Sequence, residues 1–143
     1  EPTTALDVTI QAQILRLLRE LQKQLDFSII LITHNLGVVA QTCDRLAVLY
    51  AGRVAEMGAT RAIFNDPQHP YTRGLMTAIP RPGSRGQKMS AIPGAVPSNP
   101  GAVTGCPFAP RCAQAFDRCF TSTPGFYTLS ENHSSACFLA ESH

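Results

Sequence analysis

Four cysteines in the last third of the chain are the residues best suited to chemistry by type and spacing. They follow one another as C-x5-C-x6-C-x17-C, and three of them lie within GCPFAPRCAQAFDRC, residues 105–119. Soft thiolates favour zinc or an iron–sulfur cluster over hard cations. The C-x-x-C pairs common in structural zinc sites are absent, which favours a [4Fe-4S] cluster with ligands from longer loops and leaves Zn²⁺ as the alternative. The candidate ligands are Cys106, Cys112, Cys119 and Cys137.

Buried thiols without a metal, or disulfides, are the other interpretations of these cysteines. No basic-then-apolar signal opens the chain, so we expect a cytosolic location, where thiols stay reduced. A secreted, disulfide-stapled binding protein is therefore the weaker hypothesis. Arg111 and His133 are candidate partners of the cysteines: Arg111 would neutralise thiolate charge and His133 would donate to a cysteine sulfur. Plain surface positions are the alternative for both, and Cys43 is expected to be a small buried residue on a helix.

Acidic and histidine side chains near the other end form a second candidate set. Asp7 precedes a helical pattern over residues 8–25, where it would cap free backbone N–H groups. His34 follows FSIILIT, residues 27–33, an apolar run that predicts a strand buried on both faces, as in a parallel sheet. Ligands gather beyond the carboxyl ends of such strands, so His34 is a candidate functional residue.

The remaining elements that must position these residues are short. We expect a helix over residues 36–42, followed by a hairpin whose strands, 46–50 and 53–57, are joined by a turn at Ala51-Gly52. Two further helices are expected over residues 60–65 and 72–79. With the strand above, they predict an α/β fold with an incomplete sheet. Residues 79–104 are rich in Pro and Gly, which predicts a linker, and residues 105–143 a separate loop-rich module. His69, in QHPYT, is expected to pack at the start of the last helix.

Composition argues against several classes of protein. Hydrophobic residues make up 44% of the 143 and charged residues 15%, which favours a packed core over a disordered tail. A net charge of +2 gives no support for a nucleic-acid partner. No apolar run approaches the roughly 20 residues needed to cross a bilayer, so no spanning helix is predicted.

The N-terminal motifs, taken in order, resemble the nucleotide-binding subunit of ABC transporters. EPTTALD, an amphipathic helix and a strand ending LITH match that family's catalytic glutamate, D-loop and H-loop histidine. The pieces RLAVLYAGRVAEMG and AIFNDPQHPYTRGLMTAIP resemble its oligopeptide, dipeptide and nickel importer branch. The resemblance covers almost the whole chain. It implies that residues 1–78 are the C-terminal part of a P-loop ABC ATPase domain.

This resemblance implies roles for individual residues. Glu1 would polarise the water that attacks the phosphoanhydride, and His34 would contact the γ-phosphate. Ala5, Leu6 and Asp7 would form the D-loop, at the interface with a second ATPase subunit. The intact protein would use ATP and Mg²⁺ at the cytoplasmic face of the membrane. Its other partners would be membrane-spanning permease subunits and, indirectly, an extracytoplasmic solute-binding protein.

The cysteine-rich segment is similar to the C-terminal extension of the same importer branch. In some members of that branch, four cysteines of the extension hold a [4Fe-4S] cluster. The resemblance therefore implies that residues 79–143 are this extension, and that the four cysteines named above are the ligands.

The sequence also departs from the family pattern. It contains no G-x-x-x-x-G-K-[ST] phosphate loop, no Gln loop, no LSGGQ-type signature and no aspartate before Glu1 to bind magnesium. We therefore expect a fragment that alone neither binds ATP tightly nor hydrolyses it, and that self-associates through the open edge of strand 27–33. The alternative is a non-catalytic metal- or iron–sulfur-binding regulatory module, whose α/β part serves as a docking surface.

Overall fold

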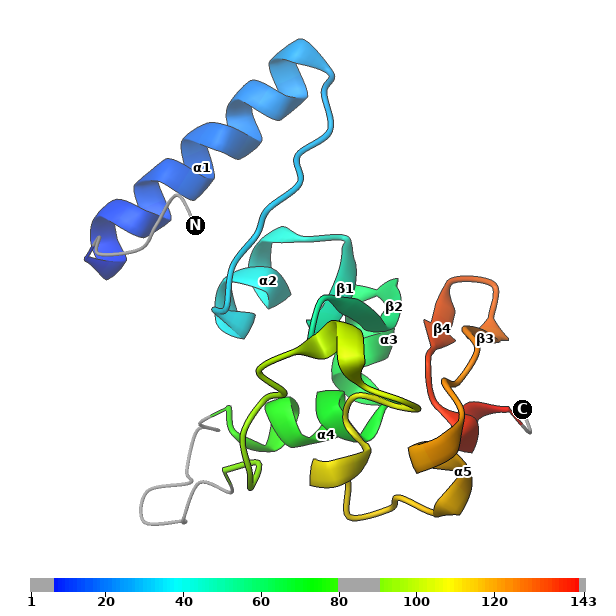
Figure 1. Cartoon of the computed structure of the whole chain (residues 1–143). Helices are drawn as coiled ribbons and strands as arrows, with labels where there is room; N and C mark the ends of the chain where they lie inside the picture. Colours follow the sequence, from blue (N-terminus) through cyan, green and yellow to red (C-terminus); the bar gives the residue numbers. More distant parts are fainter. Residues whose placement is uncertain (1–6, 80–90, 142–143) are drawn as a thin grey trace. The chain divides into compact units, whose positions relative to one another are not determined.

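The computed structural model describes residues 7–79 and 91–141, which fall into two compact units. One unit ends at Cys43 and the other begins at Asp44. Figure 1 labels the helices and strands of both units along the chain. Within the described ranges, no helix has both the length and the apolar character needed to span a membrane.

The first unit contains two helices, and the sequence predicts both. α1 spans Val8–Leu25 and α2 spans Leu36–Thr42. The carboxylate of Asp7 accepts two backbone N–H groups of the first turn of α1, both at 2.9 Å, which confirms the predicted N-cap. Asn35 caps α2 in the same way.

The strand predicted over residues 27–33 is not formed. The segment between α1 and α2 has no regular structure and pairs with none of the described strands. Ile30 and Ile32 are 92% and 74% exposed. A strand is buried on both faces only inside a sheet with covering layers, and the described sheet of this chain is built from other residues. The prediction of a buried strand is therefore wrong for this chain.

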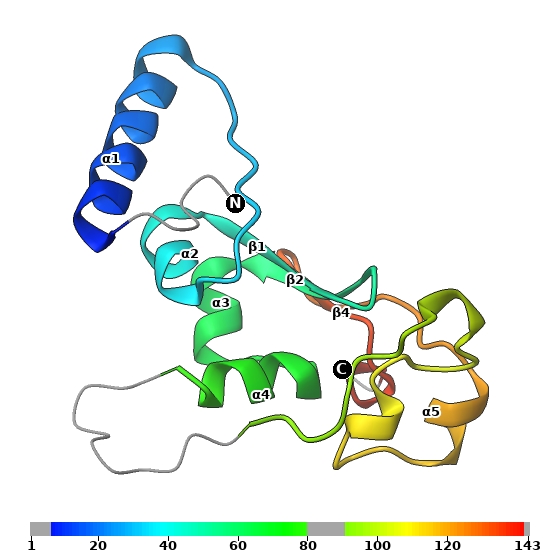
Figure 2. The same ribbon diagram turned by 60° about the vertical axis from the view of Figure 1, so that its left-hand side comes forward.

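The second unit is organised around a four-stranded antiparallel sheet. Its strands are β1 (Arg45–Tyr50), β2 (Arg53–Ala59), β3 (Tyr127–Ser130) and β4 (His133–Ser135), in the order β1-β2-β4-β3. The hairpin of β1 and β2 confirms the prediction. Its turn residues, Ala51 and Gly52, have φ values of 49° and 77°, the left-handed conformations of a tight hairpin turn. Figure 2 shows β4 running alongside β2.

Half of this sheet comes from the cysteine-rich tail, where the sequence predicts no strands. β4 pairs with β2 in a register that places Ser135 opposite Glu56 and His133 opposite Gly58. The strands come so close that a Cβ at Gly58 would lie 2.6 Å from the carbonyl oxygen of Asn132. Residues on both sides of the expected boundary between 78 and 79 thus share one sheet, and the division into residues 1–78 and 79–143 remains a prediction.

Short helices complete the second unit. α3 (Thr60–Asn65) agrees with the predicted helix, and α4 (Pro70–Thr77) begins two residues earlier than predicted. Proline is favourable at the first helical position, where its missing N–H has no intrahelical partner. The tail adds η1 (Pro100–Ala102), η2 (Ala109–Arg111), α5 (Asp117–Thr121) and η3 (Phe138–Ala140).

A small aromatic core joins the hairpin to the tail. Tyr50 of β1 packs edge-on against Phe108, with ring centroids 5.2 Å apart, and Tyr71 of α4 contacts both rings. The guanidinium of Arg111 donates to the carbonyl oxygens of Pro93 at 2.7 Å and Ile92 at 3.0 Å, and to the hydroxyl of Tyr50 at 3.2 Å. Through Arg111, these bonds attach residues 92 and 93, in the middle of the predicted linker, to the hairpin.

Candidate functional site

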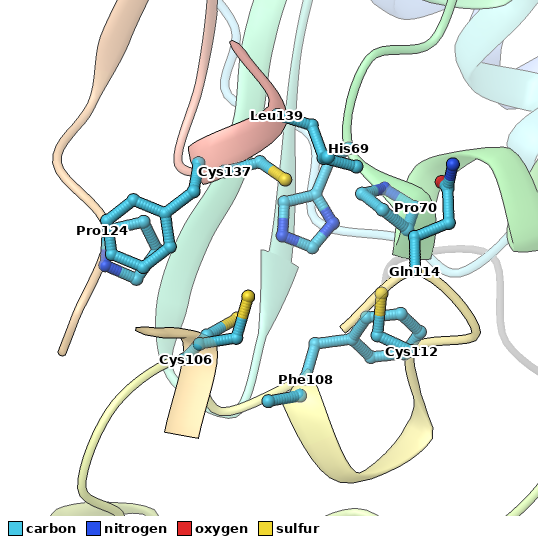
Figure 3. Close-up of a pocket in the computed structure, with 12 residues that line it drawn as sticks. His69, Pro70, Cys106, Phe108, Cys112, Gln114, Pro124, Cys137 and Leu139 are labelled. Atoms are coloured by element: carbon cyan, nitrogen blue, oxygen red, sulfur yellow. The ribbon is translucent and has the colours of Figure 1, made fainter. Parts of the chain in front are cut away.

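The four cysteines of the tail line one small pocket, which we call the thiol pocket. They share it with His69 from the start of α4 and with apolar side chains that include Phe108 and Phe138. Figure 3 shows sulfur atoms of Cys106, Cys112 and Cys137 arranged around the His69 ring. The free volume is about 20 Å³, roughly that of one water molecule. Residues predicted from spacing alone are therefore brought together by the fold.

Tight turns of the backbone position the sulfurs. The backbone N–H of Cys106 donates to the carbonyl of Cys119 at 2.8 Å, which joins two of the cysteine-bearing loops. This approach requires Gly105, which has a φ of 82° and whose Cβ, if present, would lie 2.4 Å from the same carbonyl oxygen. Cys112 follows η2 and Cys137 precedes η3, so each sits at the end of a 3₁₀ turn.

Three of the sulfurs accept hydrogen bonds from backbone N–H groups two positions further along the chain. The donors to Cys106, Cys112 and Cys137 are the amides of Phe108, Gln114 and Leu139, and the amide of Ala109 also donates to Cys106. Burial nevertheless raises the pKa of these three thiols above the usual value for cysteine, and the neighbouring cysteines raise it further. The N–H groups act in the opposite direction, because they stabilise the thiolate. The loops thus offer backbone N–H donors of the kind that sulfur ligands need. Without a cation, burial keeps these three thiols protonated.

His69 is the residue of this pocket that the sequence does not identify. Its Nδ1 accepts the backbone N–H of Tyr71 at 3.0 Å, which makes it the N-cap of α4 and confirms its predicted place at a helix start. The side chain is 4% exposed. Burial lowers the pKa of His69 from 6.5 to about 4, an effect opposed by the charge of Glu56 and reinforced by that of Arg73. The ring is therefore neutral at physiological pH. His69 is recognised as part of the thiol pocket only because the fold brings it close to cysteines far along the chain. The spacing of residues in the sequence does not predict this closeness.

A buried carboxylate holds this region together. Glu56 of β2 is fully buried, and its Oε2 accepts the backbone N–H of His69 at 2.9 Å. Its Oε1 accepts the backbone N–H of Gln68 at 2.8 Å and lies 2.6 Å from Nε2 of His133. Sequence reasoning missed Glu56, because an alternating strand pattern gives no sign that a polar residue faces the core.

The two predicted partners of the cysteines lie elsewhere. Arg111 and His133 are absent from the lining of the thiol pocket. Arg111 is occupied by Tyr50 and two carbonyl groups, and His133 is buried against Glu56 rather than on the surface. Both tie the tail to the hairpin, so the structure gives them architectural contacts.

The donor set of the thiol pocket suits a thiophilic metal by its chemistry. Four soft sulfurs face a pocket whose other walls are mostly carbon. As placed, however, no group of three or more His, Cys, Asp or Glu side chains in the described ranges is arranged to hold a metal ion. A single Zn²⁺ would need the sulfurs to draw together, whereas an iron–sulfur cluster accepts more widely spaced thiolates but needs more room than one water volume.

The second candidate set is only partly within the described residues. Glu1, Ala5 and Leu6 lie outside them. Asp7 is the N-cap of α1, as noted above. His34 is exposed between residue 33 and α2. The predicted roles of Glu1 at the attacking water and of His34 at the γ-phosphate therefore remain predictions.

Known proteins resemble this chain along nearly its whole length. Residues 55–119 match the family of the oligopeptide/dipeptide transporter C-terminal region. The chain is 50% identical over 141 residues to the dipeptide transport ATP-binding protein DppD of Bacillus subtilis, which covers 99% of the chain and 42% of the relative. It is 49% identical over 138 residues to the oligopeptide transport ATP-binding protein OppD of Salmonella typhimurium, covering 96% and 41%.

Residues 55–119 therefore carry the oligopeptide/dipeptide transporter C-terminal region, and nearly the whole chain is similar to ATP-binding proteins of peptide transport, in agreement with the resemblance of its sequence motifs. It spans about two-fifths of the length of the relatives it matches.

Proposed function

We propose that this chain is part of the ATP-hydrolysing subunit of an ABC importer for peptides, with nickel as a further solute class of the same branch. The observation that carries the proposal is the identity of 49–50% with peptide-transport ATP-binding proteins over almost all of its residues. The second ATPase subunit, the permease subunits and the solute-binding protein are the partners that follow. The site of action is the cytoplasmic face of the membrane.

The proposed chemistry is hydrolysis of a phosphoanhydride, in which positioning and charge stabilisation dominate. Glu1 polarises the attacking water as general base, and His34 contacts the γ-phosphate. Asp7, with Ala5 and Leu6, contacts the opposite subunit. The sequence of this chain offers no phosphate loop to hold ATP and Mg²⁺. The proposal therefore assigns hydrolysis to the intact subunit and none to these 143 residues alone.

The experiment compares ATP hydrolysis by the intact subunit with that of its Glu1→Gln and His34→Ala variants. Loss of a positioned general base lowers kcat by about 10²–10⁴-fold, and we expect a loss in this range for Glu1→Gln. Glu20→Gln, an exposed change on α1, serves as the matched control and keeps full activity. Full activity of both site variants, or nucleotide turnover by the 143-residue chain alone, would contradict the proposal.

A second function, binding of a thiophilic metal centre, is supported by the thiol pocket. Convergence of four sulfurs on one pocket, with backbone N–H groups directed at three of them, is the observation that favours it. Cys106, Cys112, Cys119 and Cys137 would hold either a [4Fe-4S] cluster or Zn²⁺. Such a centre would crosslink the loops that carry the four cysteines, which bury few apolar side chains between them. It would thereby stabilise the fold of the tail.

The test is the iron, sulfide and zinc content of anaerobically purified chain. We expect one centre per chain in the wild type and its loss in Cys106→Ser, with retention in Cys43→Ser, which changes a cysteine outside the pocket. Absorbance near 400 nm that disappears on oxidation identifies the cluster, and zinc without sulfide identifies the alternative. Neither metal above background in the wild type would leave the cysteines as buried thiols.

A further inference from the structure

Cys106 and Cys119 are the two pocket cysteines whose backbones are in direct contact. The backbone N–H of Cys106 donates to the carbonyl oxygen of Cys119 at 2.8 Å. Such a bond places the two Cα atoms about 6 Å apart or less, within the range of about 4.4–6.8 Å that disulfides require. Both residues also line the thiol pocket, so their side chains face the same small space. The backbone therefore meets the two geometric conditions for joining these sulfurs.

A second contact holds the same two segments together. The hydroxyl of Thr123 donates to the carbonyl oxygen of Gly105 at 3.3 Å. Gly105 itself allows the close approach, since a Cβ at this position would lie 2.4 Å from the carbonyl oxygen of Cys119. Contacts within the chain thus fix the relative position of Cys106 and Cys119.

The other two pocket cysteines have no such connection. Among the described backbone hydrogen bonds, none joins Cys112 or Cys137 to another cysteine of the pocket. The four are not joined by disulfides in this structure, and each is half-buried. A half-buried sulfur can be reached by an oxidant as small as hydrogen peroxide.

We propose that Cys106 and Cys119 form a site of reversible oxidation, at which a hydroperoxide joins their two sulfurs in a disulfide. One thiolate attacks a peroxide oxygen, the O–O bond breaks and hydroxide leaves, which gives a sulfenic acid. The second thiolate attacks the sulfenic sulfur, the S–S bond forms and a second hydroxide leaves. The two thiol protons convert both hydroxides to water. Two electrons thereby pass from the sulfurs to the peroxide, and two molecules of a small thiol reverse the reaction by exchange.

The surroundings of Cys106 determine when this site reacts. Burial raises the pKa of Cys106, and the charge of Cys119 raises it further, although backbone N–H groups oppose both effects. The thiolate is the reactive form, so oxidation is slower at neutral pH than that of an exposed cysteine. The rate should rise with pH, because more of the thiol is then ionised.

The disulfide would close the loop of residues 106–119, which includes η2. Closing a loop restricts the unfolded chain and so stabilises the folded one. The inference needs neither ATP nor a bound metal and goes beyond both proposed functions. Absence of metal from the purified chain would therefore leave it unaffected.

The experiment treats the reduced, metal-free full chain with one equivalent of hydrogen peroxide and then blocks the remaining thiols with iodoacetamide. Cleavage after Arg111, Arg118 and Glu131 places the four pocket cysteines on four different peptides. Mass spectrometry then identifies the peptides that are joined. We expect the peptides of Cys106 and Cys119 to be joined, and the number of free thiols to fall from five to three.

Variants test whether the pairing is specific. Cys119→Ser should abolish the joined peptides. Cys112→Ser is the matched control, because Cys112 lines the same pocket, and it should keep them. Cys43→Ser, outside the pocket, should keep them as well. The Tm of the oxidised wild type should be about 10 °C higher than that of the reduced chain, and dithiothreitol should reverse both changes.

Three outcomes would overturn the proposal. The first is a disulfide that joins Cys106 to Cys112 or Cys137, or that joins two chains on non-reducing electrophoresis. The second is an equal loss of the joined peptides in Cys112→Ser and Cys119→Ser. The third is retention of all five thiols after prolonged treatment at alkaline pH. An unchanged Tm of the oxidised chain would overturn the stabilising effect of loop closure.

Discussion

Glu56 on β2 and His133 on β4 meet inside the protein, with Oε1 and Nε2 only 2.6 Å apart. Glu56 is fully buried and His133 is 8% exposed. Because Glu56 also binds the backbone of Gln68 and His69, one carboxylate connects the hairpin, the tail strand and the start of α4. Removing one partner of such a buried pair leaves the other desolvated without compensation, which is costly.

We predict that Glu56→Gln destabilises the second unit by about 3 kcal/mol, because the amide cannot accept all the N–H groups that face it. The measurement is urea unfolding, followed by amide hydrogen exchange at the β2–β4 pairing. Glu131→Gln is the matched control: Glu131 is exposed beside β4 and should change stability little. Equal stability of Glu56→Gln and the control would contradict the role of this carboxylate.

Gly105→Ala is predicted to disrupt the loops that carry the cysteines. The residue has a φ of 82°, and the added Cβ would lie 2.4 Å from the carbonyl oxygen of Cys119. Left-handed strain and this clash together should cost on the order of 3 kcal/mol and weaken metal retention. Thermal unfolding and chelator competition measure the two effects.

Gly125→Ala is the control for this change. Its Cβ would meet only the Tyr127 side chain, at 3.6 Å or more, which is ordinary contact. It should keep both the stability and the metal retention of the wild type. If the Gly105→Ala chain is as stable as the Gly125→Ala control, the hydrogen bond between the backbones of Cys106 and Cys119 is not needed for stability.

Local patterns in the sequence predict elements that depend on local interactions. α1 with its Asp7 cap, α2, α3 and the hairpin at Ala51-Gly52 all follow from spacing, capping and turn chemistry. The strand over residues 27–33 fails because its burial depends on other strands, which the described sheet does not supply. The sequence does not predict β3 and β4, because their short polar segments are strands only when β4 pairs with β2 and β3 with β4.

The candidate site shows the same division. Spacing and residue type predict which cysteines belong together. They cannot predict His69 and Glu56, because those contacts join residues 13 to 77 positions apart through the fold. Nearness in sequence to Cys112 and Cys137 predicts that Arg111 and His133 act beside the cysteines, whereas in the fold their side chains contact Tyr50 and Glu56 of the hairpin.

The stability of the metal-free chain should fall as the pH falls from about 6.5 to about 4. His69 has a pKa of about 4 when folded, against 6.5 in the unfolded chain, because burial disfavours its charged form. Between these values the unfolded chain binds a proton that the folded chain does not, so acid favours unfolding. The contribution of His69 to the free energy of unfolding is fully present above pH 6.5 and amounts to about 3 kcal/mol at most.

The measurement compares the free energy of unfolding of wild type and His69→Asn across this pH range. Other groups titrate in both proteins, so the difference between the two curves isolates His69. The difference should change between pH 6.5 and 4 and stay constant above pH 7. Parallel curves throughout would contradict neutral burial of the ring.

Exposed apolar side chains after α1 predict that the chain self-associates. Ile30 is 92% exposed and Ile32 74%, in a segment that pairs with no described strand. Burying one isoleucine contributes about 1.5–3 kcal/mol, so Ile30→Glu should weaken association roughly 10- to 100-fold. Sedimentation velocity over a range of concentrations measures this association.

Ser28→Glu is the control, because it adds the same charge two residues away on an exposed polar side chain. It should weaken association much less. If the wild type stays monomeric at high concentration, or if both variants behave alike, the apolar surface of residues 27–33 does not drive association.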